Sequence, residues 1–413
     1  MLVAVVMLFV VGAMAALSID AVTLYTARSE AQLAADGAAL AGARVLANSG
    51  MTSDTTGGLT ATAEAQAIAV ATQVATQNEV GGRKLVAAEV VAVNFAGPTT
   101  NPRVTVRVQR TDLPTFFARI WGSKQITVAA SATAEAYNPS GANALGLVTT
   151  PVAPICVKPW LLPNIDPSSG GTIFDTTTGA ITNTGLLGWA STTTATRLQP
   201  ACINCSPPPP LPVPAAWRYY PGDTATTFPP PSQALPTCNP VLTTAYQESV
   251  AGCIQTPISC NSTAIFDTSD YTNRRTETAH AVNCLTHAKA DQGDTVDAPF
   301  PPATPFEFIA GADNPVAVVD PTFVGKEMMI SDSLVTVPVF NSNGAAPTNP
   351  VTIVGFVQLF LNPDGIHTPN SGGNSGYVNT TVVNMAGCGT GATGQPILGN
   401  GASPVAVRLI SPP

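Results

Sequence analysis

Histidine and cysteine side chains of this sequence could bind a metal ion. His280, Cys284 and His287 are spaced at i, i+4 and i+7, so on a helix they would share one face. Together with the pair Cys202-x-x-Cys205 they could form a tetrahedral zinc site. A single C-x-x-C is weak support, because cysteines of an exported chain more often form disulfides. We therefore predict no metal and no other cofactor.

Catalysis has little support in the sequence. The only histidines are His280, His287 and His367. The chain has no G-x-S-x-G elbow, phosphate loop or H-E-x-x-H motif, and nothing marks a catalytic carboxylate pair. The net charge is -8 and basic residues are not clustered, which argues against nucleic-acid binding. We predict that the protein is not an enzyme and has no small-molecule substrate.

Aromatic residues leave a second function open. Trp160, Trp189, Trp217 and the pair Tyr219-Tyr220 could line a glycan site, although burial in a core explains such residues better. The alternative function is therefore a surface adhesive or carbohydrate-binding module on a generic membrane anchor.

Cysteines and low charge indicate an exported chain. Charged residues make up 10% of the sequence, against roughly 25% in ordinary globular proteins. An even number of cysteines confined to one region predicts disulfides in an oxidising compartment, with unpaired buried thiols as the alternative. The candidate disulfide residues are Cys156, Cys202, Cys205, Cys238, Cys253, Cys260, Cys284 and Cys388.

The N-terminus predicts a membrane anchor over residues 1–19. Leu2 to Ile19 is free of charge and just long enough to span a bilayer. A signal peptide is the alternative, since Ala13-Met14-Ala15 offers a cleavage pattern. An uncleaved anchor is favoured, because no basic segment precedes the apolar run and the helical pattern continues beyond it. The missing basic segment also predicts a natural start upstream of Met1.

A long helix must follow the anchor, from Leu17 to Ala47. Small residues recur along it at spacings of three and four, which predicts a face that approaches another element closely. This face could contact a partner, or it could dock on the protein's own second helix and sheet. The candidate packing residues are Ala27, Ala31, Ala34, Ala38 and Ala41.

The rest of the region to residue 138 predicts one more helix and a small sheet. A second helix is expected over Thr60–Gln77, with Ala61, Ala65, Ile68, Ala71 and Ala75 on one side. Alternating residues then predict antiparallel strands, with one helical insertion. The strands are expected at Leu85–Phe95, Arg103–Gln109 and Gln125–Ala136, and the insertion at Leu113–Trp121.

Composition changes after Tyr137-Asn138-Pro139, and Pro, Thr, Asn and Gly dominate the remainder. One helix is expected there, over Thr272–Ala290. Strands are expected at Val316–Val319, Leu334–Phe340, Val351–Leu361, Tyr377–Val383 and Val405–Ile410, the third of them central because it is apolar on both faces. The predicted fold class is α+β, with an anchor at 1–19, a helix-helix-sheet domain at 20–138 and a larger, mainly β exported domain at 139–413.

The segment Ala15–Ala47 resembles the N-terminal signature of TadG-like (TadE/TadG) proteins of Flp pilus assembly, and Leu113–Ala136 resembles the segment that follows in them. The resemblance implies a structural role in assembling or anchoring pili, with the membrane and other pilus-assembly membrane proteins as partners. It implies a single-pass protein of the bacterial inner membrane, with the C-terminal domain in the periplasm or at the cell surface. The matching residues are Asp20, Tyr25, Arg28, Gln32, Ala34, Ala35, Asp36, Ala38, Ala39, Leu40, Ala41, Gly42 and Ala43.

Overall fold

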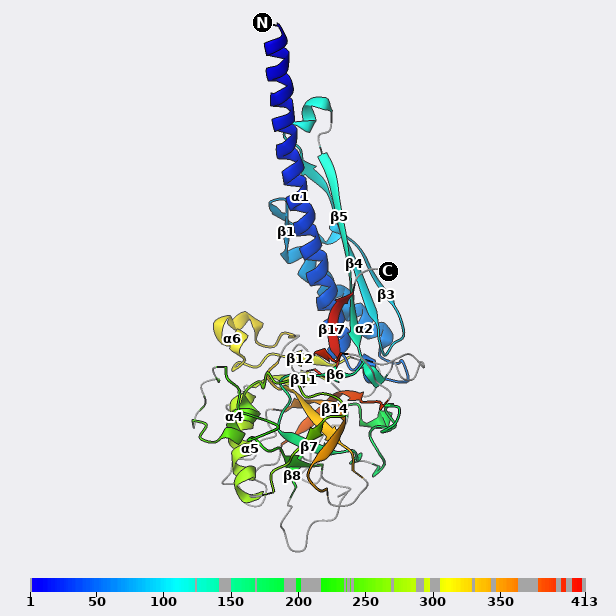
Figure 1. The fold of residues 1–413 in the computed structure, drawn as a ribbon, viewed down its shortest axis with the longest axis vertical. Helices are drawn as coiled ribbons and strands as arrows, with labels where there is room; N and C mark the ends of the chain where they lie inside the picture. The colour runs from blue at the N-terminus through cyan, green and yellow to red at the C-terminus, as the bar shows by residue number, and fades with distance from the viewer. Residues whose placement is uncertain are drawn as a thin grey trace.

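One helix, α1 (Leu2–Asn48), forms the long axis of the molecule and projects from it at the N-terminal end (Figure 1). At 1.5 Å per residue it is about 70 Å long. The computed structural model describes residues 2–122, 125–140, 150–167, 169–188, 198–201, 217–233, 235, 238, 241–268, 271–286, 293–297, 305–328, 331–342, 347–362, 378–390, 395–398 and 403–410.

The second half of α1 packs on a second helix and on a twisted sheet, and we call this assembly the helix–sheet part. Its other elements are η1 (Met51–Ser53), α2 (Thr60–Gln77), β1 (Glu79–Val80), β2 (Arg83–Lys84), η2 (Ala87–Glu89), β3 (Val90–Ala96), β4 (Arg103–Pro114), η3 (Ala118–Trp121), β5 (Gln125–Tyr137) and β17 (Ala406–Ile410). The sheet is antiparallel throughout, in the order β17-β5-β4-β3.

Small side chains let α1 lie close to its neighbours. A Cβ added at Gly42 would lie 3.2 Å from Val104 on β4 and 3.5 Å from Ala71 on α2. Val104, Val106 and Val108 face this helix layer and are fully buried, as the strict alternation of β4 predicts. The core of the helix–sheet part is therefore thin, with alanines on the helices and valines on the sheet.

The face of α2 differs from the expected one. Ala71 and Ala75 are buried as expected, and they are joined by Ala63 and Ala67. Ala61 and Ala65 are exposed instead, and Ile68 is 42% exposed. The buried set recurs every four residues, whereas the abundance of alanine allowed several registers in the sequence.

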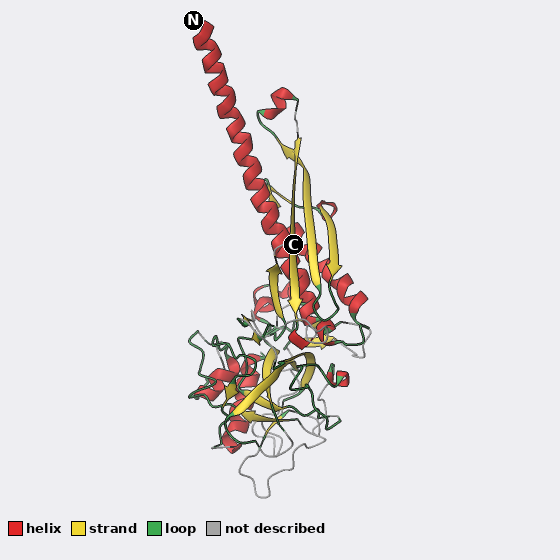
Figure 2. Cartoon of the chain, turned by 45° about the vertical axis from the view of Figure 1, so that its right-hand side comes forward, coloured by secondary structure: helices red, strands yellow, loops and turns green. Residues whose placement is uncertain are grey.

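The remaining residues form a larger, mainly β part at the opposite end from the N-terminus (Figures 1 and 2). We call it the β-rich part. Its elements are β6 (Val152–Ala153), β7 (Trp160–Pro163), η4 (Thr184–Leu186), β8 (Gln199–Pro200), β9 (Arg218–Pro221), α4 (Ala245–Ala251), β10 (Thr263–Ala264), α5 (Tyr271–Leu285), β11 (Thr295–Asp297), β12 (Glu307–Ile309), α6 (Pro315–Val319), η5 (Pro321–Phe323), β13 (Leu334–Phe340), β14 (Val351–Leu361), β15 (Thr380–Gly387) and β16 (Ile397–Leu398). The α+β class and the order of helix, small sheet and larger β region are as predicted.

The main sheet of the β-rich part is built around β14, the expected central strand. It pairs antiparallel with β13 on one side and with β15 on the other. The sheet continues from β13 through β7 and β9 to β8, while β10 pairs with the start of β14. All but one residue of β14 are buried, which explains why its sequence is apolar on both faces.

Several expected elements differ in type or extent. The strand expected at Tyr377–Val383 is β15, which runs on to Gly387. Val316–Val319 lies in the helix α6 and not in a strand, because Asn314 caps its first turn and Pro315 starts it. The helix expected over Leu113–Trp121 is confined to the turn η3, since β4 runs on to Pro114. The strand expected to start at Leu85 starts at Val90, after the turn η2.

The two parts meet at a buried polar junction. The side-chain oxygen of Asn384 on β15 accepts hydrogen bonds from the hydroxyls of Thr52 (3.3 Å) and Ser53 (3.2 Å). Its amide nitrogen donates to the carbonyl of Ala47 near the end of α1. All three polar side chains are fully buried. Because buried polar groups are costly when unpaired, these bonds fix one arrangement of α1 on the β-rich part.

Asn138, the residue after β5, completes the junction. Its amide nitrogen donates to the carbonyls of Thr52 (3.2 Å) and Met385 (2.9 Å). Next to it, the hydroxyl of Ser140 accepts a hydrogen bond from the backbone N–H of Gly387 (2.6 Å). The end of the first sheet is thereby tied to β15 by side chains from both segments.

Candidate membrane-proximal site

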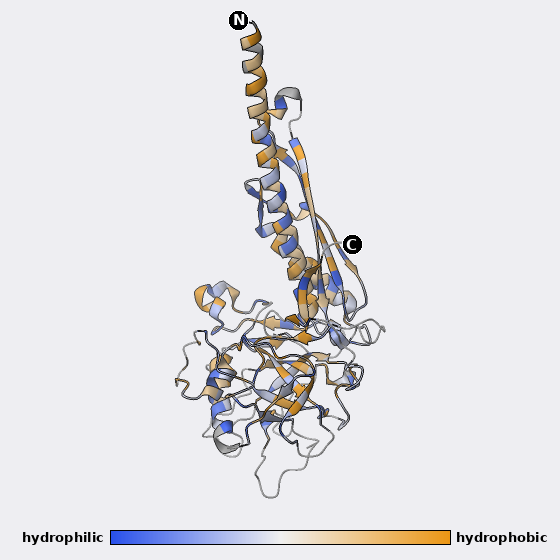
Figure 3. Cartoon of the chain, in the orientation of Figure 1, coloured by the Kyte–Doolittle hydropathy of each residue, from blue (hydrophilic) through white to orange (hydrophobic). Residues whose placement is uncertain are grey.

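The first third of α1 lies outside the packed protein. Its described side chains from Val3 to Ile19 are exposed or half-exposed, and most are apolar (Figure 3). α1 is long and apolar enough to cross a membrane. Exposed apolar side chains on this scale are stable in a bilayer but costly in water.

Asp20 ends this apolar segment and binds a turn that is distant in sequence. Its carboxylate accepts hydrogen bonds from the backbone N–H groups of Phe116 (2.9 Å), Phe117 (3.0 Å) and Ala118 (2.6 Å). The side chain is only 4% exposed. We call this arrangement the Asp20 clamp. It holds the β4–β5 connection against α1 at the point where the apolar segment ends.

The clamp favours the charged carboxylate. Burial raises the pKa of Asp20, but the hydrogen bonds from Ala118, Phe116 and Phe117 lower it, and the net pKa lies below the ordinary value of an aspartate. Asp20 is therefore an anion at neutral pH. Its charge is balanced by backbone dipoles, and among the described contacts of Asp20 no cation is paired with it.

A groove of about 370 Å³ lies immediately beyond the clamp, between α1 and β5. Tyr25 is 79% exposed and Arg28 is also exposed, so a phenol and a guanidinium stand at a mainly apolar surface. Both residues belong to the segment that resembles pilus-assembly proteins. The lining residues are Ala21, Leu24, Tyr25, Arg28, Ile126, Thr127, Val128 and Ala129.

The structure places all five candidate packing residues inside the protein. Ala27, Ala31, Ala34 and Ala38 are at most 1% exposed and Ala41 is 9% exposed. The same helix contacts α2 near Gly37 and Gly42, and Gln32 donates to the carbonyl of Ser131 on β5. The face is therefore occupied by the protein's own second helix and sheet, which was one of the two alternatives.

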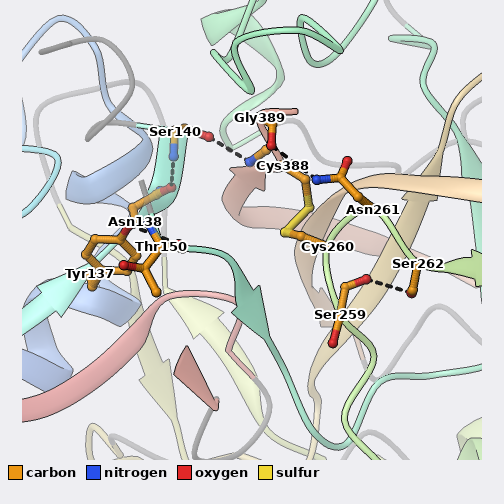
Figure 4. Close-up of a disulfide and its surroundings, with 11 residues drawn as sticks. Tyr137, Asn138, Ser140, Thr150, Ser259, Cys260, Asn261, Ser262, Cys388 and Gly389 are labelled. Carbon is orange, nitrogen blue, oxygen red and sulfur yellow. Dashed lines mark hydrogen bonds between the residues drawn. A yellow bond between two sulfur atoms is a disulfide. The ribbon is translucent and has the colours of Figure 1, made fainter. Parts of the chain in front are cut away.

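Six of the eight candidate cysteines lie together in three pairs: Cys156–Cys253, Cys238–Cys284 and Cys260–Cys388. Cys202 and Cys205 lie outside the described residues. The pair Cys260–Cys388 is close to the junction, beside the segment from Tyr137 to Ser140 (Figure 4). There the side chain of Asn261 also donates to the carbonyl of Gly389 (3.1 Å).

The pairing removes one ligand from the zinc alternative. Cys284 is bonded to Cys238, so it is not available as a thiolate. His280 is half-buried on α5, whereas His287 and His367 lie outside the described residues. Within the described ranges, no group of three or more His, Cys, Asp or Glu side chains is placed to hold a metal ion.

The aromatic residues that could have lined a glycan site lie in the interior. Trp160, Trp217, Tyr219 and Tyr220 are at most 5% exposed. Trp160 donates to the hydroxyl of Tyr246 (3.1 Å) and packs on Tyr219. Trp189 lies outside the described residues. No observation in the described chain favours the carbohydrate-binding alternative.

Comparison with known proteins bears on the segment that contains these features. Residues 1–45 match the model of the Tad family, described as Flp pilus-assembly TadE/G-like. The match covers the apolar segment, Asp20, the groove residues of α1 and the buried alanine face. It confirms the resemblance at the N-terminus and supports a role in pilus assembly. It also favours a structural role, membrane anchoring and partners among membrane-associated pilus components.

No curated protein and no solved structure matches the chain. Sequence reasoning located the segment of the site but missed the Asp20 clamp and the polar junction. Asp20 stood out only as a residue shared with TadG-like proteins, and its partners are backbone groups that any residue type supplies.

Proposed function

We propose that the protein is a single-pass, membrane-anchored structural component of a Tad/Flp pilus-assembly machine. The observation that carries the proposal is the continuity of α1. One uninterrupted helix begins as an exposed apolar segment, matches the Tad family model over residues 1–45 and ends in the core of the protein. A helix of this kind transmits position and force from the membrane to the β-rich part without a hinge.

The same proposal assigns a role to each region. Residues 1–19 form the span, residues 20–138 together with β17 form the rigid support, and the rest of residues 139–413 faces the partners in the periplasm or at the cell surface. The disulfide pairs in the β-rich part support export through the inner membrane, because disulfides persist in oxidising compartments. The rigid support includes β17, which returns to the first sheet from the end of the chain.

Partner contact within the membrane must use small residues that the protein leaves open. The alanine face beyond the span is already occupied, whereas a Cβ added at Gly12 would meet nothing within 4 Å. Gly12 lies beside Ala13, Ala15 and Ala16, and helices associate in membranes where small residues permit close packing. We propose that this stretch receives a helix of another pilus-assembly membrane protein.

The test is Gly12→Leu in the full chain, with Val11→Leu as the matched control because it adds little bulk. Leucine at position 12 strengthens the helix and clashes with nothing in the isolated protein, so membrane level and solubility in detergent should be unchanged. Co-purification with pilus membrane proteins and surface piliation should fall, while the control keeps both. Normal piliation of the Gly12→Leu strain would refute partner packing at this site.

A further inference from the structure

The connection between β4 and β5 exposes an apolar side chain, that of Phe116, that the core does not use. Residues 116–121 of this connection have the sequence Phe-Phe-Ala-Arg-Ile-Trp, and we call them the aromatic tip. Phe116 is 59% exposed and Arg119 is also exposed. More than half of the surface of Phe116 is therefore left open, although phenylalanine is normally buried.

The position of the aromatic tip along α1 is fixed by the Asp20 clamp. The three bonded N–H groups belong to Phe116, Phe117 and Ala118, and Asp20 directly follows the apolar segment Leu2–Ile19. Within the helix–sheet part, the tip is the piece of the sheet that reaches farthest toward the N-terminal end of α1 (Figure 1). Phe116 therefore stands at the level where the apolar segment of α1 ends, and Ile19 and Val22, which lie close to Asp20 in the sequence, are exposed as well.

The clamp also removes the main obstacle to burying this turn among lipids. A backbone N–H that enters the hydrocarbon core of a bilayer without a partner costs several kcal/mol, so an unpaired turn could not reach the boundary between headgroups and acyl chains at low cost. Here the N–H groups at the start of the tip are bonded to a carboxylate, so the turn can enter the interface without leaving them unpaired. Phenylalanine side chains on interfacial elements bury at the boundary between headgroups and acyl chains, and an arginine beside them can extend to lipid phosphates.

We propose that the aromatic tip is a second membrane contact, which inserts into the lipid headgroup region beside α1. The partner is the bilayer interface, because the tip is continuous with the exposed apolar surface of α1. Two contacts on separate elements fix the tilt and rotation of the molecule about its anchor, which one helix alone does not. This inference rests on the proposed anchoring by α1.

Tryptophan quenching tests the membrane contact of the aromatic tip separately from the anchoring by α1. The full chain is reconstituted in two sets of phosphatidylcholine vesicles, with lipids brominated near the carbonyl end of the acyl chains to test positions 116 and 33 and near the terminal methyl to test position 11, which lies close to the middle of the span. Three variants are compared in a Trp121→Phe background: Val11→Trp within the span, Phe116→Trp at the tip, and Leu33→Trp as the control. Leu33 is 68% exposed on α1 and lies about 20 Å beyond Asp20 at 1.5 Å per residue. The background protein supplies the signal of the remaining tryptophans, which is subtracted.

We expect quenching and a blue-shifted emission at positions 11 and 116, and neither at position 33. Quenching at 11 without quenching at 116 would overturn the tip contact and leave the anchor standing. Absence of quenching at 11 would refute the anchor itself, and the tip contact with it. Quenching at 33 as well as at 116 would show a molecule lying flat on the membrane, which also contradicts a specific tip contact.

Discussion

The carboxylate of Asp20, which directly follows the apolar segment of α1, holds a turn almost a hundred residues away in the sequence. Asp20 satisfies three consecutive backbone donors that would otherwise need water. A buried donor without a partner costs free energy, so a carboxylate that pairs three of them has a large effect on local order. The shape of the molecule next to the membrane therefore depends on one residue.

Asp20→Asn should loosen residues 116–118, because a neutral amide accepts fewer and weaker hydrogen bonds than a carboxylate and brings an N–H₂ group to the same donors. The measurement is hydrogen exchange of these amides, corrected for intrinsic rates, in detergent. Amides of α2, far from the clamp, serve as the internal control. Equal protection of residues 116–118 in both proteins would show that the clamp is not what orders the turn.

The hydrogen-exchange protection of the amides of residues 116–118 should depend on pH. The pKa of Asp20 is below its ordinary value in the folded protein. Such a group stabilises the fold fully above its unfolded pKa, about 3.9, and the contribution is lost as the pH falls through the lower folded value. Protection in the natural protein should thus be constant from neutral pH to about 4 and should decline below it. The Asp20→Asn variant should lack this step, and a step above pH 6 would point to a different group.

The helix α1 meets two different requirements, because its apolar N-terminal end is exposed and one face of its second half is buried. The second half meets its requirement with alanine and glycine, which allow α2, β4 and β5 to approach its backbone. Such packing leaves no room for larger side chains. Fully buried small residues of this face, such as Ala34, should therefore be sensitive to added bulk.

Ala34→Leu should lower the free energy of unfolding by about 1–3 kcal/mol, as overpacking of a tight core does. Ala34 is 0% exposed on α1. Ala65→Leu is the matched control, since Ala65 is exposed on the neighbouring helix and the same atoms are added there. Denaturant unfolding of the full chain in detergent gives both values. A cost at position 65 as large as at position 34 would contradict the assignment of the buried face.

The elements also show where sequence patterns are sufficient. α2 and β14 were predicted at their observed bounds, because their length and their apolar pattern leave few alternatives. Val316–Val319 was predicted as a strand from its β-branched residues, but the helix-start signals at Asn314 and Pro315 determine its structure. Those helix-start signals could have been recognised in the sequence. The partners of Asp20 and Asn384 could not be predicted, because a local pattern does not specify contacts between distant segments.

At the scale of the molecule, the disulfide pairs join segments that are far apart and interleaved. Cys238 lies within the loop closed by Cys156 and Cys253, yet it is bonded to Cys284 beyond that loop. The widest pair, Cys260–Cys388, spans 128 residues and connects the segment before β10 to the end of β15. These bonds hold the β-rich part together where helices are few.

Replacing Cys260 and Cys388 by serine should destabilise the protein by about 2–5 kcal/mol. In the chain-entropy view the effect should exceed that of replacing Cys238 and Cys284 by about 1 kcal/mol, because the latter pair spans only 46 residues. Denaturant unfolding of the two double variants checks the order. Mass spectrometry of unreduced peptides checks the pairs, and a peptide joining Cys253 to Cys260 would contradict them.

β17 closes the edge of β5 with residues that are distant from it in the sequence. The last described strand pairs with β5 from Ala406 opposite Tyr137 to Ile410 opposite Thr133, and Arg408 forms an ion pair with Glu135 (2.6 Å). A chain that stops before residue 406, through premature termination or proteolysis, leaves the edge of β5 unpaired. Unpaired edges attract other strands and proteases. β17 covers the end of β5 that lies next to the β-rich part (Figure 1), so the edge of the first sheet is shielded from other strands only when residues 406–410 are in place.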